Sequence, residues 1–433
     1  MLRLLYTLLH YISLPVIILR LLYRSRRVPG YARRWYERFG FFRTPKPPMK
    51  SIWMHSVSVG ETIASAPLVN ALKIRYPQHR IVVTTMTSTG SDRVRAIHGD
   101  SVFHVYVPYD LPGAINRFLD RITPELVILM ETELWPNIIA TCHKRHIPVL
   151  LTNARLSERS ARGYARFGPL TRGMLQQLSF IAAQARDDAE RFIQLGYPRC
   201  RIQVTGTLKY DLKVERTLGE KADALRAQWL AGRSASTRIL IAASTHEGEE
   251  EQVLSAYAKV RSHCKDALLL LVPRHPDRFD DVHALITSRN LSVVRRSSNE
   301  PVTASTDVIL GDTMGEMMLL FSASDISFVG GSLVPTGGHN LLEPAATGLP
   351  VISGPYLFNF EDVAATLQAA NALFVVRDQE ELADSIIMLL NDEALIESTG
   401  QAGKRVVEQN RGALEKQLTL AANLMHEEPL TES

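Results

Sequence analysis

Hydrophobic positions along this chain follow two alternating periods, that of a strand and that of a helix. Short runs rich in Val, Ile and Leu are separated by stretches whose apolar residues recur every three or four positions. Buried strands that alternate with helices in this way are typical of a parallel β-sheet covered by helices on both faces. The pattern therefore predicts an α/β protein.

A first series of elements is predicted between residues 51 and 152. The predicted strands are Ser51–Val57, Ile81–Thr87, Leu126–Met130 and Val149–Thr152, and the predicted helices are Ile63–Tyr76 and Ile138–His146. Ligands of such sheets bind beyond the carboxyl ends of the strands. Two polar loops are expected at that edge, HSVSVGE at 55–61 and ETELWPN at 131–137.

A second series is predicted from about Ile202, where a strand ends at Gly206. The further predicted strands are Arg238–Ala243, Ala267–Val272, Val293–Val294, Val308–Leu310 and Ile326–Val329, and the helices are Glu249–His263, Met314–Ser324 and two or three within Gln379–Met425. The simplest architecture is two α/β halves with a hinge near Val204–Leu212.

The N-terminus carries an apolar run, Leu4–Leu19, between Arg3 and Arg20. A membrane-spanning helix needs about 20 residues, so this run predicts an interfacial helix or a marginal span. A cleaved signal peptide is disfavoured, because no small-residue cleavage site follows and the next stretch is rich in arginine. Those arginines are Arg24, Arg26, Arg27, Arg33, Arg34 and Arg38. A buried first helix of the globular fold is the remaining alternative.

The charge distribution supports a membrane anchor. Residues 1–50 hold eleven Lys or Arg and one acidic residue, Glu37, for a charge of +10, whereas the rest of the chain carries −6. A nucleic-acid-binding protein would spread its basic residues over the folded body, so no nucleic-acid partner is expected. Basic residues beside an apolar helix instead predict attraction to anionic lipid and a cytoplasmic location for the chain that follows.

Length and composition set the remaining bounds. A chain of 433 residues with 45% hydrophobic and 22% charged residues is long enough for two folded domains. The three cysteines are widely spaced, which predicts neither a disulfide framework nor a metal site. A reducing compartment follows from this usage.

The stretch from Val329 to Pro355 reads as a strand, a glycine loop and a helix. Glycine pairs lie at 330–331 and 337–338, and Asn340 and Glu343 follow them. Glycines allow a ligand close to the backbone, and a helix start favours anions, so a phosphate is one expectation here. Glu343 is placed to accept hydrogen bonds from a ribose. The alternative is a tight turn in which Glu343 only favours the helix dipole.

Four side chains in the first half are candidates for acid–base chemistry. Glu61 is expected at a helix start facing the sheet edge, where it can act as a general base or can simply stabilise the helix. Glu131 and Glu133 share a face if the strand continues through them, and either orient a substrate or form a charged rim. Lys209 offers a cation at the hinge, or decorates the surface.

In the second half, Arg274 and His275 follow a buried strand. A guanidinium suits phosphate binding there, although Arg274 can also pair with Asp277. Gly315, Glu316 and Met317 open a helix and are candidates for contacts to a base or a phosphate. The sequence has no D-x-D, GxGxxG or GxxxxGK[ST] motif and no Cys/His cluster, so no metal or cofactor is expected.

Seven motifs occur in this order behind the basic N-terminus: HSVSVGE, ETELWPN, TNARLSERS, VTGTLKYD, VPRHP, GDTMGEM and GGHNLLEP. Together they resemble the 3-deoxy-D-manno-octulosonic acid (Kdo) transferases of lipopolysaccharide synthesis, from Leu4 to about Asn410. The resemblance implies a GT-B fold, with two Rossmann-like domains and a cleft between them. It also implies an inverting, metal-independent transfer.

The resemblance further assigns residues to roles. Glu61 corresponds to the catalytic base, and Glu131 and Lys209 correspond to residues that support the transition state. The matching CMP contacts are Pro273, Arg274, Gly315, Glu316, Met317, Asn340, Leu341, Leu342 and Glu343.

The hypothesis is therefore a transferase that moves Kdo from CMP-Kdo to a lipid A precursor, lipid IVA, at the cytoplasmic face of the inner membrane. Its expected parts are a membrane anchor at 1–23, a basic juxtamembrane segment and linker at 24–50, an acceptor domain at 51–205 and a CMP-Kdo domain with terminal helices at 206–425. The alternatives are another lipid-acceptor transferase with a uridine diphosphate donor, a nucleotide-sugar epimerase on the same fold, and a non-catalytic membrane scaffold.

Overall fold

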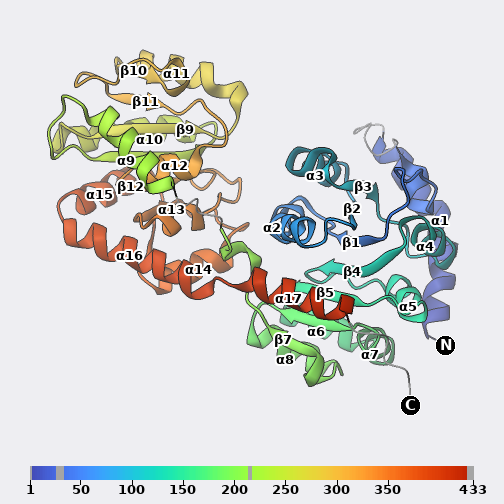
Figure 1. The fold of residues 1–433 in the computed structure, drawn as a ribbon. Coiled ribbons are helices and arrows are strands. Elements are labelled where there is room, and N and C mark those ends of the chain that lie inside the picture. The colour runs from blue at the N-terminus through green and yellow to red at the C-terminus, as the bar shows by residue number, and fades with distance from the viewer. Residues whose placement is uncertain (1, 26–33, 213–216, 427–433) are drawn as a thin grey trace. The chain divides into compact units, whose positions relative to one another are not determined.

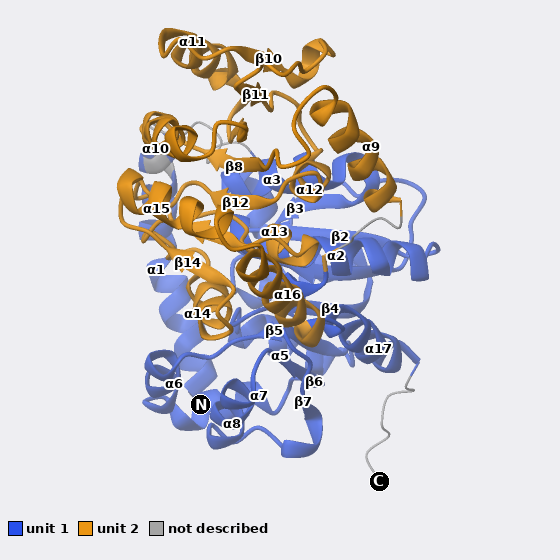
Figure 2. Cartoon of the chain, turned by 90° about the vertical axis from the view of Figure 1, so that its left-hand side faces the viewer, with its two compact units in different colours: residues 1–211, 411–433 blue, residues 212–410 orange. Residues whose placement is uncertain are grey.

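The protein, seen in a computed structural model that describes residues 2–25, 34–212 and 217–426, forms two compact units (Figure 1). Unit 1 comprises Met1–Asp211 and Arg411–Ser433, and unit 2 comprises Leu212–Asn410 (Figure 2). Each unit is a parallel sheet between layers of helices. The predicted α/β class, with two Rossmann-like domains, is confirmed.

Unit 1 contains a seven-stranded sheet in the order β3-β2-β1-β4-β5-β6-β7, with every pairing parallel. Its strands are β1 Ser51–His55, β2 Arg80–Thr85, β3 Phe103–Tyr106, β4 Pro124–Met130, β5 Val149–Ala154, β6 Phe180–Ala183 and β7 Ile202–Val204. Trp53 and its neighbours Ile52 and Met54 are fully buried but join different apolar clusters. Because successive strand residues face opposite sides, this sheet has a core on each face.

The helices of unit 1 cover both faces of this sheet. They are α1 Leu2–Ser25, α2 Val59–Arg75, α3 Ser88–His98, α4 Pro112–Ile122, α5 Pro136–Lys144, α6 Glu158–Ala165, α7 Gly168–Leu175, α8 Arg186–Gln194 and α17 Ala413–His426, with short 3-10 helices η2 Trp35–Phe39, η3 Gly99–Ser101, η4 Arg199–Arg201 and η5 Leu208–Tyr210.

Unit 2 repeats this plan with the strand order β10-β11-β9-β8-β12-β13-β14. Its strands are β8 Ile239–Thr245, β9 Leu268–Pro273, β10 Val293–Arg295, β11 Val308–Leu310, β12 Ile326–Val329, β13 Val351–Ser353 and β14 Leu373–Val375. Its helices are α9 Leu218–Leu230, α10 Glu249–His263, α11 Phe279–Ser288, α12 Met317–Ser322, α13 Leu342–Thr347, α14 Glu361–Ala369, α15 Gln379–Leu390 and α16 Glu393–Asn410, with η6 Pro276–Arg278 and η7 Arg296–Ser298.

The chain passes from unit 2 back to unit 1 before its last helix, which corrects the expected domain at 206–425. The Asp211 carboxylate accepts hydrogen bonds from the backbone N–H groups of Gly412 (2.7 Å) and Leu414 (2.8 Å). Leu418 and Ala421 of α17 are buried in the cluster that includes Leu68 of α2. The terminal helices therefore divide, with α15 and α16 in unit 2 and α17 in unit 1 (Figure 2). Likewise, β7 is the edge strand of the first sheet and not the start of the second.

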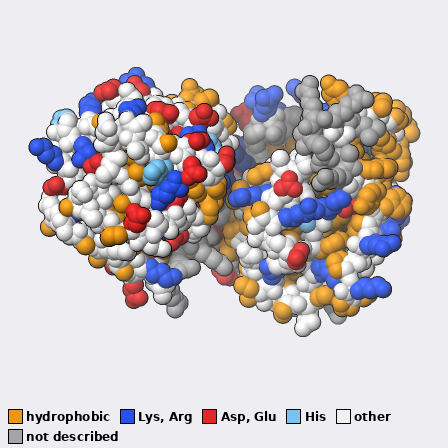
Figure 3. Space-filling model, turned by 90° about the horizontal axis from the view of Figure 1, so that it is seen from above, with side chains coloured by type: hydrophobic (Ala, Val, Ile, Leu, Met, Phe, Trp, Pro, Cys, Tyr) orange, Lys and Arg blue, Asp and Glu red, His pale blue; other side chains and the backbone are white. Residues whose placement is uncertain are grey.

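The predicted N-terminal helix is confirmed as α1, and this helix has two different faces. Its stretch Leu2–Leu21 is long and apolar enough to cross a membrane, and none of that stretch is buried inside the protein. Its exposed side chains include Leu4, Leu5, Leu8, Leu9, Ile12, Val16, Leu19 and Tyr23. Hydrophobic side chains gather on the side of unit 1 where α1 runs (Figure 3).

The opposite face of α1 carries polar groups that bond to unit 1. The Tyr6 hydroxyl donates to the Asp110 carboxylate (2.9 Å), and the Thr7 hydroxyl donates to the Asn137 side chain (3.0 Å). Asp110 is buried, and it also accepts from the backbone N–H groups of Asn137 and Ile138 at the start of α5. The helix is therefore fixed along the surface of unit 1 by its polar face.

Two of the six arginines expected in the juxtamembrane segment belong to the folded body. Arg38 is buried, donates to the Met86 carbonyl (2.8 Å) and lies 4.5 Å from the centroid of the Tyr106 ring. Arg34 pairs with Glu37 and donates to the His104 carbonyl. The predicted boundary at residue 50, between the juxtamembrane segment and the first domain, is thus wrong for Arg34 and Arg38. Arg26, Arg27 and Arg33 lie outside the described residues.

Candidate functional site

Each sheet has one point at which the strand order reverses. In unit 1 this point lies between β1 and β4, and in unit 2 between β8 and β12. In open α/β sheets, ligands bind beyond the carboxyl ends of the strands at such a switch point. The two loops that follow β1 and β4 are HSVSVGE and ETELWPN, so the structure brings both motifs to the switch point of unit 1.

Glu61 lies at the start of α2, as expected, and its carboxylate turns back onto the helix end. It accepts hydrogen bonds from the backbone N–H groups of Val57 (2.8 Å) and Ser58 (3.3 Å), and from the Ser58 hydroxyl (2.8 Å). Ser58 in turn accepts from the Glu61 N–H, which completes a capping box. Since an ionised carboxylate has about four acceptor sites, about one is left for a substrate hydroxyl.

Glu131 and Glu133 do not share a strand face. β4 ends at Met130, and Glu131 adopts a left-handed backbone conformation with φ of 54°. This conformation is uncommon outside glycine and costs free energy, and such strain concentrates at functional sites. The extended geometry on which the expectation depended is therefore absent.

Glu133 is the carboxyl whose ionisation is most altered at this site. It is half-buried, and its Oε2 accepts a hydrogen bond from Trp135 Nε1 (3.0 Å). Burial, followed by the nearby negative charge of Glu61, raises the pKa of Glu133 to about 7. Glu133 therefore exchanges a proton near neutral pH beside Glu61. Glu133 was a candidate from the sequence together with Glu131, but its altered ionisation depends on burial and on Glu61 and was not predicted.

His55, the last residue of β1, lies beneath the same site. It is fully buried, and its Nδ1 bonds to the Thr84 hydroxyl (2.9 Å), while its Nε2 has no hydrogen-bond partner within the described chain. Burial lowers the pKa of His55 to about 4, so the ring is neutral at physiological pH.

Lys209 is half-buried in η5, next to α2. Its neighbour Leu208 lies in the same buried cluster as Ala64 and Leu68 of α2, and the Leu208 N–H donates to the Asn153 side chain. The structure thus places the helix that begins near Glu61 and the turn that carries Lys209 against each other.

In unit 2, all the expected donor contacts lie at the carboxyl edge of the sheet. Pro273 ends β9 and Arg274 follows it, residues 315–317 follow β11, and residues 340–343 follow β12. These strands, with β8, are neighbours in the sheet and are parallel, so their carboxyl ends share one edge. The guanidinium of Arg274 has no hydrogen bond or ion pair in the described part of the chain, so the alternative in which it pairs with Asp277 is not formed.

The first glycine pair does not offer its N–H groups to a phosphate. The buried carboxylate of Glu249 accepts from the backbone N–H groups of Gly331 (2.6 Å), Ser332 (2.9 Å) and Leu333 (2.8 Å), and from that of His246 (2.9 Å). An internal anion therefore occupies the position expected for a ligand. The prediction of a phosphate on this part of the loop is corrected.

Farther along this loop, Asn340 organises the start of α13. Its side-chain oxygen accepts from the Leu342 N–H (3.1 Å), and its amide donates to Glu343 (3.0 Å). Burial raises the pKa of Glu343, against the effects of the Asn340 hydrogen bond and the charge of Arg274. Glu316 is likewise held, by Arg296 (3.1 Å) and the Thr313 hydroxyl (2.5 Å).

Three histidines converge on the same edge. His246 follows β8, His275 follows β9, and His339 lies in the loop after β12. The His246 and His339 rings are nearly parallel, with their Nε2 atoms 2.8 Å apart, and the His275 ring centroid lies 5.2 Å from that of His246. Only His275 was predicted as a candidate from the sequence, because the other two rings meet through the fold.

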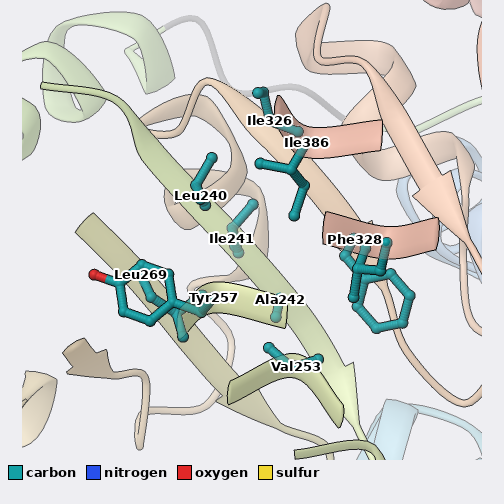
Figure 4. A pocket seen from close by; sticks show the side chains of 10 residues that line it. Leu240, Ile241, Ala242, Val253, Tyr257, Leu269, Ile326, Phe328 and Ile386 are labelled. Carbon is teal, nitrogen blue, oxygen red and sulfur yellow. The ribbon is translucent and has the colours of Figure 1, made fainter. Parts of the chain in front are cut away.

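No three His, Cys, Asp or Glu side chains are arranged to hold a metal ion in the part of the chain that is described. The expectation of a metal-independent reaction stays a prediction. An apolar pocket in unit 2 also offers no chemistry, because its ten lining residues are hydrophobic (Figure 4). The Tyr257 hydroxyl, the polar group among them, bonds to the carbonyls of Ala267 and Asp307.

Sequence comparisons show the family of the chain. Residues 33–212 match the family profile of 3-deoxy-D-manno-octulosonic-acid transferase (kdotransferase), and residues 244–406 match that of glycosyl transferases group 1. The 3-deoxy-D-manno-octulosonic acid transferase of Haemophilus influenzae is 45% identical over 420 residues, which cover 96% of this chain and 97% of that protein.

Two solved structures are also similar. The C-terminal CMP-Kdo-binding domain of WaaA from Acinetobacter baumannii is 32% identical, over 49% of this chain and 100% of that chain, with a TM-score of 0.39. UDP-GlcNAc 2-epimerase from Neisseria meningitidis, bound to UDP-GlcNAc, is 15% identical over 86% of this chain and 100% of that chain, with a TM-score of 0.54. At this low identity the second likeness concerns the two-domain GT-B-type fold alone.

Proposed function

The chain belongs to the family of 3-deoxy-D-manno-octulosonic-acid (Kdo) transferases, and on that premise we propose that it moves Kdo from CMP-Kdo to a hydroxyl of the lipid A precursor lipid IVA. It is a glycosyltransferase of lipopolysaccharide biosynthesis. The donor, the acceptor and an inverting mechanism without a metal are the parts that we propose.

The observation that carries the proposal is the pair of carboxyl groups at the switch point of unit 1. Glu61 keeps about one acceptor site free, and Glu133 beside it has a pKa of about 7. Glu61 accepts the proton of the acceptor hydroxyl as the hydroxyl oxygen attacks the anomeric carbon of Kdo. CMP leaves from the opposite face of the sugar, so the configuration inverts.

The remaining roles follow the motif resemblance. Lys209 offsets the charge that develops on the departing phosphate, and Glu131 supports the transition state. In unit 2, Arg274 binds the phosphate, and Glu343 accepts hydrogen bonds from the ribose. The other proposed donor contacts are Pro273, Gly315, Glu316, Met317, Asn340, Leu341 and Leu342.

We propose that α1 holds the enzyme at the cytoplasmic face of the inner membrane as an in-plane helix. Its hydrogen bonds through Tyr6 and Thr7 keep the polar face on unit 1, and the exposed leucines on the other face suit the interface between headgroups and acyl chains. Basic residues after the helix add attraction to anionic lipid.

The direct test is an assay with purified protein, CMP-Kdo and tetraacylated lipid A precursor, with the products weighed by mass spectrometry. The expected product is the precursor plus Kdo, formed equally well in the presence of a metal chelator. Glu61→Gln should lose at least about 10²-fold in turnover, because general-base catalysis typically contributes 10²–10⁴.

The same assay separates the alternatives. An epimerase would alter a nucleotide sugar without any acceptor, and a uridine-diphosphate-dependent transferase would be stabilised thermally by UDP and not by CMP. A scaffold would be unaffected by Glu61→Gln. Loss of less than tenfold in that variant would remove Glu61 from the role of base.

A further inference from the structure

The histidine cluster at the carboxyl edge of unit 2 follows three neighbouring strands, and its rings form no ion pair with a carboxylate among the described residues. We propose that His246, His275 and His339, together with Arg274, bind an anionic group of the donor, and that the His246–His339 pair takes up a proton when the anion binds. The identity of this anion as a nucleotide phosphate or a sugar carboxylate rests on the proposed function.

The backbone is strained to place these rings. Ser244 has a φ of 57°, where β8 departs from its regular pairing with β9, and this turn carries the chain into His246. Gly331 has a φ of 68°, and a Cβ atom there would lie 2.8 Å from the His339 ring. Strain and a required glycine at two strand ends are features of a constructed ligand site.

The His246–His339 contact limits the charge of the pair. Their Nε2 atoms are 2.8 Å apart, so one nitrogen must donate and the other must accept. Two imidazolium rings would direct two N–H groups at each other, and the pair therefore carries at most one positive charge. The Nδ1 atoms of both rings have no protein partner among the described residues, which leaves them for a ligand.

The surroundings of the pair are mainly basic. Arg274, His275 and Arg278 face His246, and Arg274 and His275 also face His339. Glu249 is the carboxylate close to His246, but its oxygens already accept four backbone N–H groups. Burial first, and then Arg274, lowers the pKa of His339 to about 4, and burial also lowers the pKa of His246, so the pair is neutral at physiological pH.

Binding of an anion would reverse the preference of the histidine pair for its neutral form. A phosphate or carboxylate beside Arg274 and the Nδ1 atoms favours the charged form of the pair, because an opposite charge at hydrogen-bond distance stabilises an imidazolium. Binding then draws one proton into the pair from solvent. The linkage predicts tighter binding of the anion as pH falls.

Titration calorimetry of the full-length protein in detergent tests this inference. CMP is titrated at about pH 6.5 in buffers of different ionisation enthalpy, which gives the number of protons taken up. The wild type is expected to take up more protons with CMP than either His246→Gln or His339→Gln does, and each variant is expected to bind CMP about tenfold more weakly, the loss of one charge-assisted hydrogen bond. The phosphate of CMP itself titrates at about pH 6, so the same titrations with the methyl ester of CMP, a diester that stays ionised, isolate proton uptake by the rings.

Further titrations, with a control variant and with two other ligands, identify the anion. His263→Gln, an exposed histidine at the end of α10, should match the wild type. Cytidine lacks the phosphate, and free Kdo carries only the carboxylate. Linked proton uptake with CMP identifies the phosphate, and uptake with free Kdo identifies the carboxylate.

Equal proton uptake by wild type and both variants, or uptake with cytidine equal to that with CMP, overturns the inference. Kdo transfer without linked uptake would leave the proposed function standing and the inference wrong. Linked uptake without Kdo transfer would support the anion site and contradict the proposed function.

Discussion

At the scale of single residues, Glu133 is the group whose environment has the clearest consequence for stability. Its pKa is raised from the ordinary 4.5 to about 7, first by burial and then by the charge of Glu61. Between these two pH values the folded state holds a proton that the unfolded state has released. The free energy of unfolding therefore falls as pH rises through this window. The full loss, which comes from ionising Glu133 in the folded protein, is reached above about pH 7.

Glu133→Gln should remove this penalty. Because Glu133 is half-buried and partly screened by water, we expect the variant to be about 1–2 kcal/mol more stable than wild type at pH 8, and about equal at pH 4.5. Urea unfolding at both pH values measures this, with the exposed Glu158→Gln as the control. A stability difference that does not change with pH would show that Glu133 is not the titrating group.

Glu249 carries a second prediction, because its carboxylate accepts four backbone N–H groups, three of them from the glycine loop. Glu249→Gln would point an amide N–H₂ at those donors and leave some of them without an acceptor. A buried unsatisfied group costs about 1–3 kcal/mol, so unit 2 should lose about 2–4 kcal/mol of unfolding free energy.

Glu251→Gln is the matched control for Glu249→Gln, since Glu251 is an exposed acid in the same first turn of α10. Denaturant unfolding of the two variants should separate them clearly. Equal stability would mean that the loop does not depend on its internal anion.

These residues also show which contacts cannot be predicted from local sequence patterns. The position of Glu61 at a helix start followed from the local order of strand, turn and helix, and it is confirmed. Three of the four backbone partners of Glu249 are about 80 residues away along the chain, and the His246–His339 contact joins residues 93 positions apart. No local period encodes such pairings, so the sequence predicted a phosphate where the protein places its own carboxylate.

At the scale of elements, segments with an unbroken apolar run or a clear break at each end could be predicted, and segments with a mixed pattern could not. Strands β11 and β12 and helix α10 have the expected bounds, because their apolar runs end at clear breaks. Elements that were not predicted include strands β3, β6 and β14 and helices α3, α4, α6, α7, α8, α9, α11 and α14. β3, Phe103–Tyr106, is only half-buried at its first two residues and contains His104, so it lacks the continuous apolar run that marks β11 and β12.

The two faces of α1 give a prediction at this scale. Replacing Leu8, Ile12, Val16 and Leu19 by Gln removes most of the apolar stripe, and each buried side chain of this kind is worth about 1.5–3 kcal/mol. Binding to lipid vesicles should fall by more than about 10². The thermal unfolding of the protein should be unchanged, since these side chains are exposed in the folded protein.

Ile74→Gln, an exposed apolar residue on α2, is the control for vesicle binding. Salt distinguishes the two modes of anchoring, because attraction between basic residues and lipid is screened at high ionic strength. An in-plane helix should be released in part by salt in the wild type, and replacing Arg24, Arg26 and Arg27 by Gln should weaken binding at low salt and reduce the effect of salt. Release by detergent alone would indicate a span.

At the scale of the whole molecule, the chain crosses between its two units twice, near residues 212 and 410. The first crossing was predicted from the hinge at Val204–Leu212. The second was not, because α15, α16 and α17 are all amphipathic and their sequences do not say which sheet each one covers. Contacts made far along the chain decide this, through Asp211 and the cluster around Leu68.

The return of α17 makes unit 1 dependent on the last residues of the chain. Removing everything after Asn410 takes away Leu418, Leu420 and three alanines that are buried in unit 1, together with the partners of Asp211. At about 1.5–3 kcal/mol for each leucine, plus the exposed surface left on α2, the loss approaches the 5–15 kcal/mol that stabilises a whole domain. Calorimetry of the shortened protein should therefore show the unit 1 transition lowered or absent and the unit 2 transition unchanged. Removing only residues 427–433 should change neither transition. If the chain that ends at Asn410 kept both unfolding transitions, unit 1 would not depend on α17. Loss of both transitions would show that the two units fold as one.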